Sequence, residues 1–106
     1  MNARIYPILI ELRQRLEALY GPRLVKMILY GSQARGDADP GSDIDVLVVL
    51  RGLVQPGEEI TRTSATVADL SLRFNEVISC LFMDDARFTE RNGPLLRNVR
   101  REEIIL

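Results

Sequence analysis

The sequence predicts a small α/β (α+β) fold, in which a mixed sheet of three to four strands is flanked by helices. Apolar residues recur at steps of three and four along the first segment, which is typical of an amphipathic helix. Short apolar runs, several of them rich in β-branched residues, cover residues 24–30, 42–50 and 76–83, and helical patterns separate them. A length of 106 residues corresponds to one domain, residues 1–106, with a single hydrophobic core.

The first helix is predicted from the apolar positions between residues 5 and 19. Pro7 suits its first turn, where a backbone N–H has no partner in any case, and Gly21-Pro22 ends it. The run 24–30 follows as a buried strand and leads directly into a Gly-Ser pair.

A short helical turn is predicted over residues 32–35, where Gly36 ends it before a polar loop. Residues 42–50 form the clearest strand, and their nearly continuous apolar run indicates a central strand covered on both faces. A second long helix is predicted over 58–74 and a third strand over 76–83.

The last quarter of the chain predicts two shorter helices and an apolar tail. Asp84 and Asp85 are expected to cap a helix through Phe88, and a last helical stretch is expected over 95–101. The tail 104–106 either forms a contact strip for a partner or folds back onto the core.

Composition excludes several kinds of chemistry. Histidine is absent, which excludes a Ser-His-Asp triad, a Cys-His pair and a His-ligated zinc site. Cys80 is the only cysteine, so no internal disulfide can form, which is compatible with a reducing cytoplasm. The net charge of -1 does not favour direct nucleic-acid binding. We find no secretory signal and no apolar run near the ~20 residues that span a membrane, and we expect a cytoplasmic protein.

Asp43 and Asp45 are the first candidates for chemistry. Residues two apart on a strand place their side chains on the same face, here at the rim of the sheet. Two neighbouring carboxylates repel each other, and a hard cation such as Mg²⁺ relieves that repulsion. One or two Mg²⁺ ions held there would polarise a phosphoryl group. Alternatively, both aspartates only solvate the end of a strand.

Gly31 and Ser32 are the second candidates. Glycine lets the backbone approach a phosphate closely, N–H groups at the start of a helical turn attract anions, and the Ser32 hydroxyl adds a donor. Alternatively, Ser32 only caps the turn.

The whole stretch reads Gly-Ser-Gln-Ala-Arg-Gly over residues 31–36 and Ser-Asp-Ile-Asp-Val over residues 42–46. It resembles the polymerase-β-type nucleotidyltransferase superfamily, whose hallmark is Gly-Ser, a short helix, and Asp-x-Asp on the next strand. It is most similar to the minimal nucleotidyltransferases, and every signature position of their pattern is matched. The resemblance implies a nucleotidyltransferase-like fold over nearly the whole chain.

The resemblance also implies roles for individual residues. Gly31 and Ser32 would hold the β- and γ-phosphates of ATP or another nucleoside triphosphate, and Asp43 and Asp45 would hold Mg²⁺ beside the α-phosphate. Ser42, the first residue of the Ser-Asp-x-Asp motif, is also expected to bind the nucleotide. The implied reaction transfers a nucleoside monophosphate, by our expectation AMP, to a protein or RNA hydroxyl and releases pyrophosphate.

Arg35 has two interpretations. It either binds phosphate or pairs with Asp37 or another nearby carboxylate and braces the loop.

Active members of the superfamily carry a third carboxylate on a following strand. Glu76 is one candidate for this catalytic acid, and Asp69, on the preceding helix, is a remote substitute. Ser79 occupies about the position where the third acid would fall. It points to the opposite face from Glu76, so only one of the two can face Asp45.

The resemblance further implies a partner. Minimal nucleotidyltransferases commonly act with a small helical protein of the HEPN type, as the antitoxin of a toxin–antitoxin pair, and a second copy of the chain is another possible partner. A catalytically degenerate nucleotide-binding or partner-binding module that neutralises a toxin by complex formation is the main alternative. A phosphohydrolase with Asp43 as nucleophile is a third.

Two further features favour ordinary structural roles. Cys80, flanked by apolar residues, is expected in the core. The basic residues Arg97, Arg100 and Arg101 are expected on a solvated helix face, with phosphate or RNA binding as the alternative.

Overall fold

The computed structural model describes residues 3–39, 41–90, 93–94, 96–97, 99 and 104–106. Two short 3-10 turns, Ala3–Ile5 and Gly21–Arg23, flank the first helix. The remaining elements follow in the order α1 (Tyr6–Tyr20), β1 (Leu24–Tyr30), α2 (Ser32–Arg35), β2 (Ile44–Leu50), α3 (Pro56–Phe74), β3 (Ile78–Asp84), α4 (Asp85–Glu90) and β4 (Ile104–Ile105).

The strands form one mixed sheet in the order β3-β2-β1-β4. Strand β1 runs antiparallel to both β2 and β4, whereas β2 and β3 are parallel. The parallel pair requires a crossover, and the 19-residue helix α3 provides it. The predicted fold class, a small mixed sheet flanked by helices, is confirmed.

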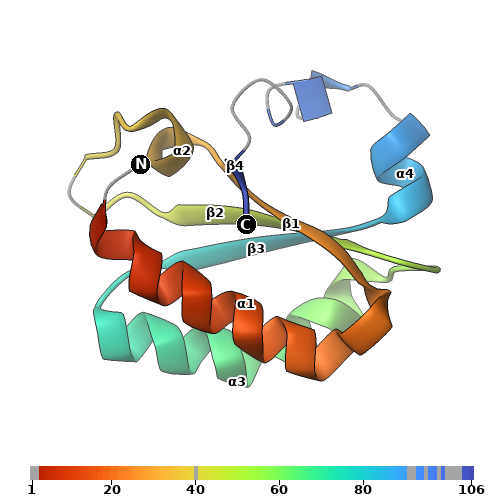
Figure 1. Ribbon diagram of the computed structural model, residues 1–106, viewed down its shortest axis with the longest axis horizontal. Helices are drawn as coiled ribbons and strands as arrows, with labels where there is room; N and C mark the ends of the chain where they lie inside the picture. The colour runs from red at the N-terminus through yellow and green to blue at the C-terminus, as the bar shows by residue number, and fades with distance from the viewer. Residues whose placement is uncertain (1–2, 40, 91–92, 95, 98, 100–103) are drawn as a thin grey trace.

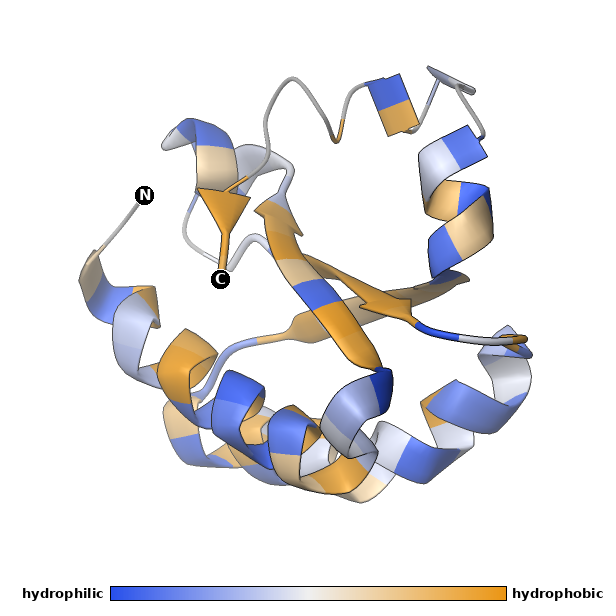
Figure 2. Ribbon diagram, turned by 45° about the vertical axis from the view of Figure 1, so that its right-hand side comes forward, coloured by the Kyte–Doolittle hydropathy of each residue, from blue (hydrophilic) through white to orange (hydrophobic). Residues whose placement is uncertain are grey.

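Helices α1 and α3 lie side by side against one face of the sheet, while α2 and α4 lie on the other side of it (Figure 1). The larger core cluster lies between these two long helices and the sheet, and it includes Leu12 and Leu16 of α1 and Val46 and Val48 of β2. The strands are largely hydrophobic, and the long helices carry hydrophilic residues between their apolar ones (Figure 2). Among the described residues, no helix combines the length and the apolar character needed to cross a bilayer.

The opposite face of the sheet carries a smaller apolar cluster. Leu47 and Val49 of β2 pack there with Phe88 of α4 and with Leu96 and Val99. Residues of β2 therefore alternate between the two faces, and odd-numbered positions point away from α1 and α3.

Several predicted boundaries differ from the structure by two residues. Helix α3 begins at Pro56 and not at residue 58, because proline fits the first helical turn. Strand β2 begins at Ile44 and not at residue 42, since its pairing with β3 starts at Ile44 opposite Ile78. Asp43 therefore lies just before the strand and not within it.

The capping interaction at α4 follows the prediction. The Arg87 N–H donates to the Asp84 side chain at 2.8 Å, so Asp84 caps the turn that starts at Asp85. The predicted helix over 95–101 lies largely outside the described residues, as do Arg100 and Arg101. Arg97, which is described, is exposed.

The apolar tail folds back onto the sheet as β4. Ile104 and Ile105 pair with β1, and the Leu106 N–H donates to the carbonyl of Met27 at 2.9 Å. Of the two roles considered for the tail, packing against the fold is the one the structure shows.

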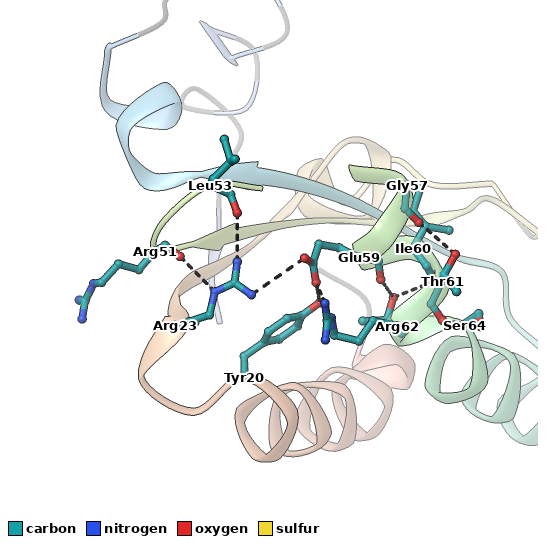
Figure 3. Close-up of polar contacts among 11 residues, drawn as sticks. Tyr20, Arg23, Arg51, Leu53, Gly57, Glu59, Ile60, Thr61, Arg62 and Ser64 are labelled. Carbon is teal, nitrogen blue, oxygen red and sulfur yellow. Dashed lines mark hydrogen bonds and ion pairs between the residues drawn. The ribbon is translucent and has the colours of Figure 1, made fainter. Parts of the chain in front are cut away.

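A buried polar cluster joins Tyr20 at the end of α1, Arg23 just before β1 and Glu59 in the first turn of α3, as Figure 3 shows. Glu59, only 2% exposed, accepts a hydrogen bond from the Tyr20 hydroxyl at 2.7 Å and another from Arg62 Nε at 3.0 Å. Arg23 lies 4.0 Å from the second Glu59 oxygen and donates from Nε to the Arg51 carbonyl at 3.1 Å. The cluster thereby ties the end of α1 and the start of β1 to the first turn of α3.

Candidate active site

The turn after β1 is built around Gly31. Gly31 has a φ of +76°, a conformation that residues with a side chain rarely adopt. Its carbonyl accepts hydrogen bonds from the N–H groups of Ala34 and Arg35, each at 3.1 Å, which closes the single turn of α2. The N–H groups of Ser32 and Gln33 open this turn, and no backbone acceptor within the described part of the chain pairs with either.

The same glycine lies directly against the carboxylate of Asp45. A Cβ atom placed on Gly31 would lie 2.7 Å from Asp45 Oδ2, closer than such atoms approach in proteins. The absence of a side chain at position 31 therefore lets the Gly-Ser turn and the first carboxylate of β2 occupy adjacent space. The structure brings together the two motifs that the sequence singled out.

Asp45 stands in the middle of a row across three strands. It pairs with Tyr30 on β1 and with Ser79 on β3. Directly paired residues on neighbouring strands project to the same face, which here is the face away from α1 and α3. The position beside Asp45 on β3 thus carries a hydroxyl.

Burial and repulsion act on the carboxylate pair. Asp43 is exposed, whereas Asp45 is partly buried. Burial, and then the negative charge of Asp43, raise the pKa of Asp45 above its usual value. The pKa of Tyr30 is also raised, first by burial and then by the charges of Asp45 and Cys80. A cation between Asp43 and Asp45 would relieve the strain on the pair, and two carboxylates completed by phosphate oxygens suit Mg²⁺.

The structure does not bring the proposed third acids to this place. Glu76 lies before β3 and pairs with Arg4 at 2.9 Å, and its side chain is only 8% exposed. Asp69 pairs with Arg15 and Arg73 on the surface between α1 and α3. Within the described ranges, no acidic, cysteine or histidine side chain forms a group of three that could hold a metal ion.

The sequence profile of the nucleotidyltransferase domain family matches residues 9–93. This chain belongs to that family. A Methanocaldococcus jannaschii protein named "Putative protein adenylyltransferase" is 33% identical over 97 residues, which cover 91% of each chain. The predicted family is therefore confirmed.

Two further comparisons bear on the nucleotidyltransferase domain. Another Methanocaldococcus jannaschii protein with the same descriptive name is 39% identical over 67 residues, which span 63% of this chain but only 44% of that relative. A crystal structure described as a toxin-antitoxin with AMP-PNP superimposes with a TM-score of 0.61 at 16% identity, covering 88% of this chain and 68% of that one. At that identity, the likeness supports the fold of the nucleotidyltransferase domain alone.

Gln33 contributes to the nucleotidyltransferase site in a way that the sequence analysis missed. It is 3% exposed, and its Nε2 donates to the Ser42 carbonyl at 3.4 Å. The Ser42 N–H in turn donates to the Asp39 carbonyl at 3.0 Å. These bonds fix the loop that delivers Asp43. A polar residue inside the Gly-Ser turn was the only sequence signal for this role.

Arg35 braces the loop after α2. Its Nε donates to the Asp37 carboxylate at 3.1 Å, and both side chains are largely exposed. The structure therefore supports the pairing with Asp37, one of the two alternatives for this residue. An exposed pair of this kind contributes little stability.

Cys80 is a core residue and not a nucleophile. It points to the face opposite Ser79, and burial raises the pKa of its thiol to about 12. The reactive thiolate is therefore scarce at neutral pH.

Replacing Gly31 by alanine is expected to damage the site more than the fold. The new Cβ overlaps Asp45 Oδ2, and a displacement of reacting groups by about 1 Å lowers a rate roughly 100-fold. The backbone at position 31, with a φ of +76° and a ψ of -159°, is in a region essentially restricted to glycine, which adds a loss of about 1–3 kcal/mol in the free energy of unfolding. Initial rates of nucleotidyl transfer and urea denaturation measure the two effects.

Gly57→Ala serves as the control, because a Cβ at Gly57 meets no atom within 4 Å. Full activity of Gly31→Ala would contradict the close packing of Gly31 against Asp45.

Proposed function

We propose that this domain is an Mg²⁺-dependent nucleotidyltransferase that transfers AMP from ATP to a hydroxyl of a protein acceptor, with RNA as the other acceptor class to be tested. The observation that supports the proposal is the close approach of Gly31 to Asp45, by which the Gly-Ser turn lies beside a partly buried carboxylate. The names of the Methanocaldococcus jannaschii relatives support adenylyl transfer to protein.

Each site residue has a role in this proposal. The N–H groups of Ser32 and Gln33 and the Ser32 hydroxyl donate to the phosphates of ATP. Asp43 and Asp45 hold the metal. When bound, Mg²⁺ neutralises phosphate charge and polarises the α-phosphate. Ser42 positions the loop that precedes Asp43, through its contact with Gln33.

The proposed reaction is a substitution at phosphorus. The acceptor oxygen forms a bond to the α-phosphorus, and the bond from that phosphorus to the bridging oxygen breaks. Pyrophosphate leaves with the electron pair, and the hydroxyl proton passes to water. Positioning and charge stabilisation account for most of the catalysis of such transfers.

The proposal includes a partner and a compartment. The solved structure with AMP-PNP is a toxin–antitoxin complex, which supports a toxin as partner and an antitoxin role for this chain. We infer that the toxin is a small helical protein of the HEPN type and that the pair acts in the cytoplasm. Co-purification of the tagged chain from its source cells tests the partner.

ATP labelled at the α-phosphate tests the function. The purified protein is incubated with this ATP, Mg²⁺ and a lysate of the source cells, beside an Asp43→Asn control. Label on a protein with the wild type alone supports adenylyl transfer to protein, and label on RNA alone identifies the other acceptor class. Absence of label on any macromolecule, with the ATP shown to be intact, contradicts the proposal.

The position of Ser79 favours a second candidate function. Because Ser79 takes the place beside Asp45 where active relatives are expected to carry an acid, the domain could bind nucleotide without efficient transfer. Such a module would neutralise its partner by complex formation.

Ser79→Asp is expected to separate the two candidates. An added carboxylate beside Asp45 supplies a third metal ligand or a base, and a positioned base raises a rate by about 100-fold or more. If the wild type already transfers AMP, the gain is small. If the wild type is degenerate, transfer appears only in the variant. Ser71→Asp, at a partly exposed position of α3, is the matched control.

A further inference from the structure

The position of Asp43 is set by the residues on either side of it. Strand β2 begins one residue later, at Ile44, which is buried and whose N–H donates to the Val77 carbonyl at 2.8 Å. Ser42 precedes the strand, in a loop where its N–H donates to the Asp39 carbonyl at 3.0 Å. The strand therefore fixes one side of Asp43, and the loop must fix the other.

Gln33 joins this loop to helix α2. It is 3% exposed, and its Nε2 donates to the Ser42 carbonyl at 3.4 Å. The bond between Ser42 and Asp39 closes a turn within the loop, whereas the bond from Gln33 comes from another element. Because a buried amide without a partner costs free energy, this bond restrains Ser42 and, through it, the backbone of Asp43.

The turn that carries Gln33 also touches the other carboxylate of the pair. A Cβ on Gly31 would lie 2.7 Å from Asp45 Oδ2, so the turn and this side chain are in close contact. Ala34 of the same turn packs against the larger core cluster, which anchors α2 to the core. One anchored turn thus contacts Asp45 directly and restrains the loop of Asp43 through Gln33. It therefore determines how the two carboxylates are placed relative to each other.

We propose that Gln33 is a positioning residue that makes the proposed metal site selective for Mg²⁺ over Ca²⁺. The inference rests on the proposed function, which assigns metal binding to Asp43 and Asp45. Mg²⁺ requires near-ideal octahedral geometry with ligands at about 2.1 Å, whereas Ca²⁺ accepts flexible arrangements with ligands at about 2.3–2.6 Å. A restrained pair of carboxylates favours Mg²⁺, and a pair with one mobile member still accommodates Ca²⁺.

A purely structural role for Gln33 predicts a different result. If its side chain only filled space beneath the loop, its loss would lower the stability of the protein and weaken the binding of both ions alike. A positioning role predicts that Mg²⁺ binding weakens much more than Ca²⁺ binding. The ratio of the two affinities is therefore the measurement that separates the two roles.

Two substitutions of Gln33 remove the bond to Ser42 in different ways. Gln33→Met keeps the length of the side chain and removes the donor. Gln33→Asn keeps the amide but shortens the side chain by one methylene, and the contact is already 3.4 Å long in the wild type. Gln14→Met makes the first of these changes at an exposed position of α1 and is the matched control.

Melting temperatures of the nucleotide-free protein, measured against the concentration of Mg²⁺ or Ca²⁺, test the inference. Loss of a residue that orients a metal ligand lowers metal affinity by about 10- to 100-fold. Both Gln33 variants should therefore need at least about tenfold more Mg²⁺ for the same rise in melting temperature, and nearly the wild-type concentration of Ca²⁺. Gln14→Met should respond to both ions as the wild type does.

The same change should appear in catalysis as a difference between two kinetic constants. In transfer of labelled AMP, both Gln33 variants should raise the KM for Mg²⁺ by about tenfold or more and approach the wild-type kcat when Mg²⁺ is saturating. In NMR spectra of the wild type, Mg²⁺ should shift the side-chain amide signal of Gln33 and leave that of Gln14 unchanged. This last measurement does not depend on the folding of any variant.

The outcomes separate the inference from the proposed function. Equal weakening of Mg²⁺ and Ca²⁺ binding, a wild-type Mg²⁺ response of Gln33→Met, or an unshifted Gln33 amide signal overturns the inference. The proposed function stands in each of these cases if the wild type transfers labelled AMP. A selective loss of Mg²⁺ binding in both Gln33 variants, without AMP transfer by the wild type to any acceptor, supports the inference and overturns the enzymatic proposal.

Discussion

Replacing Asp45 by asparagine is expected to abolish nucleotidyl transfer and to make the metal-free domain more stable at pH 7. The substitution preserves the size of a side chain that packs against Gly31 while it removes a proposed metal ligand. Metal and phosphate charge stabilisation contributes several kcal/mol to such reactions, so we expect a loss of about 1,000-fold in kcat. Transfer of labelled AMP to the lysate acceptor measures this loss.

The pH dependence of stability follows from the direction of the pKa shift. The pKa of Asp45 is raised in the folded protein by burial and then by the charge of Asp43. The folded state therefore holds the proton more tightly than the unfolded state, and metal-free stability falls as pH rises from below about 3.9 through the raised pKa. Asp45→Asn removes that fall, so its melting temperature should exceed that of the wild type at pH 7.

Metal addition provides the check. Mg²⁺ should raise the melting temperature of the wild type at pH 7 and have little effect on Asp45→Asn. Asp39→Asn is the control, because Asp39 is exposed in the same loop. A variant less stable than the metal-free wild type at pH 7 would show that Asp45 is held by favourable contacts and not under repulsion.

Removing the Glu59 carboxylate is expected to cause a large loss of stability at a distance from the site. Glu59→Ala deprives the buried Tyr20 hydroxyl of its acceptor and removes the ionic contact of Arg62. Loss of such a buried, charge-assisted cluster costs about 3 kcal/mol in the free energy of unfolding. Urea denaturation gives this value directly.

Two comparisons isolate the Glu59 cluster. Glu58→Ala changes the exposed neighbour in the same helical turn and should cost less than about 0.5 kcal/mol. Tyr20→Phe combined with Glu59→Ala should cost less than the sum of the single changes, because the double variant leaves no buried hydroxyl without an acceptor. Additive losses would show that Tyr20 and Glu59 act independently.

Local sequence patterns predicted most elements of the fold. Strand β1 and the turn Ser32–Arg35 have the predicted bounds, since a glycine follows each of them and the apolar run of β1 is unambiguous. The direction of the strands was not predictable. A helix such as α3 permits a parallel crossover without requiring it, and the register that sets Asp45 beside Ser79 depends on that direction.

The parts that sequence reasoning missed depend on contacts between distant residues. Glu59 looks like any acidic residue in a first helical turn, where such residues are common. Only the folded chain shows that the hydroxyl of Tyr20, 39 positions away, donates a hydrogen bond to the buried carboxylate of Glu59. Likewise, glycine at position 31 was expected for access to phosphate, and the structure adds that a carboxylate occupies the space a side chain would need.

The contact between Gly31 and Asp45 joins residues of one antiparallel strand pair, β1 and β2, and the loop between them. The proposed phosphate-binding turn and both proposed metal ligands are therefore encoded by one short stretch of the gene. Exchange of this one segment between homologues would transfer the turn and both aspartates together, whereas Ser79 of β3, which lies beside Asp45, would be inherited separately. Chimaeras joined at Arg23 and at Arg51 would combine the turn and aspartates of one parent with the β3 residue of the other.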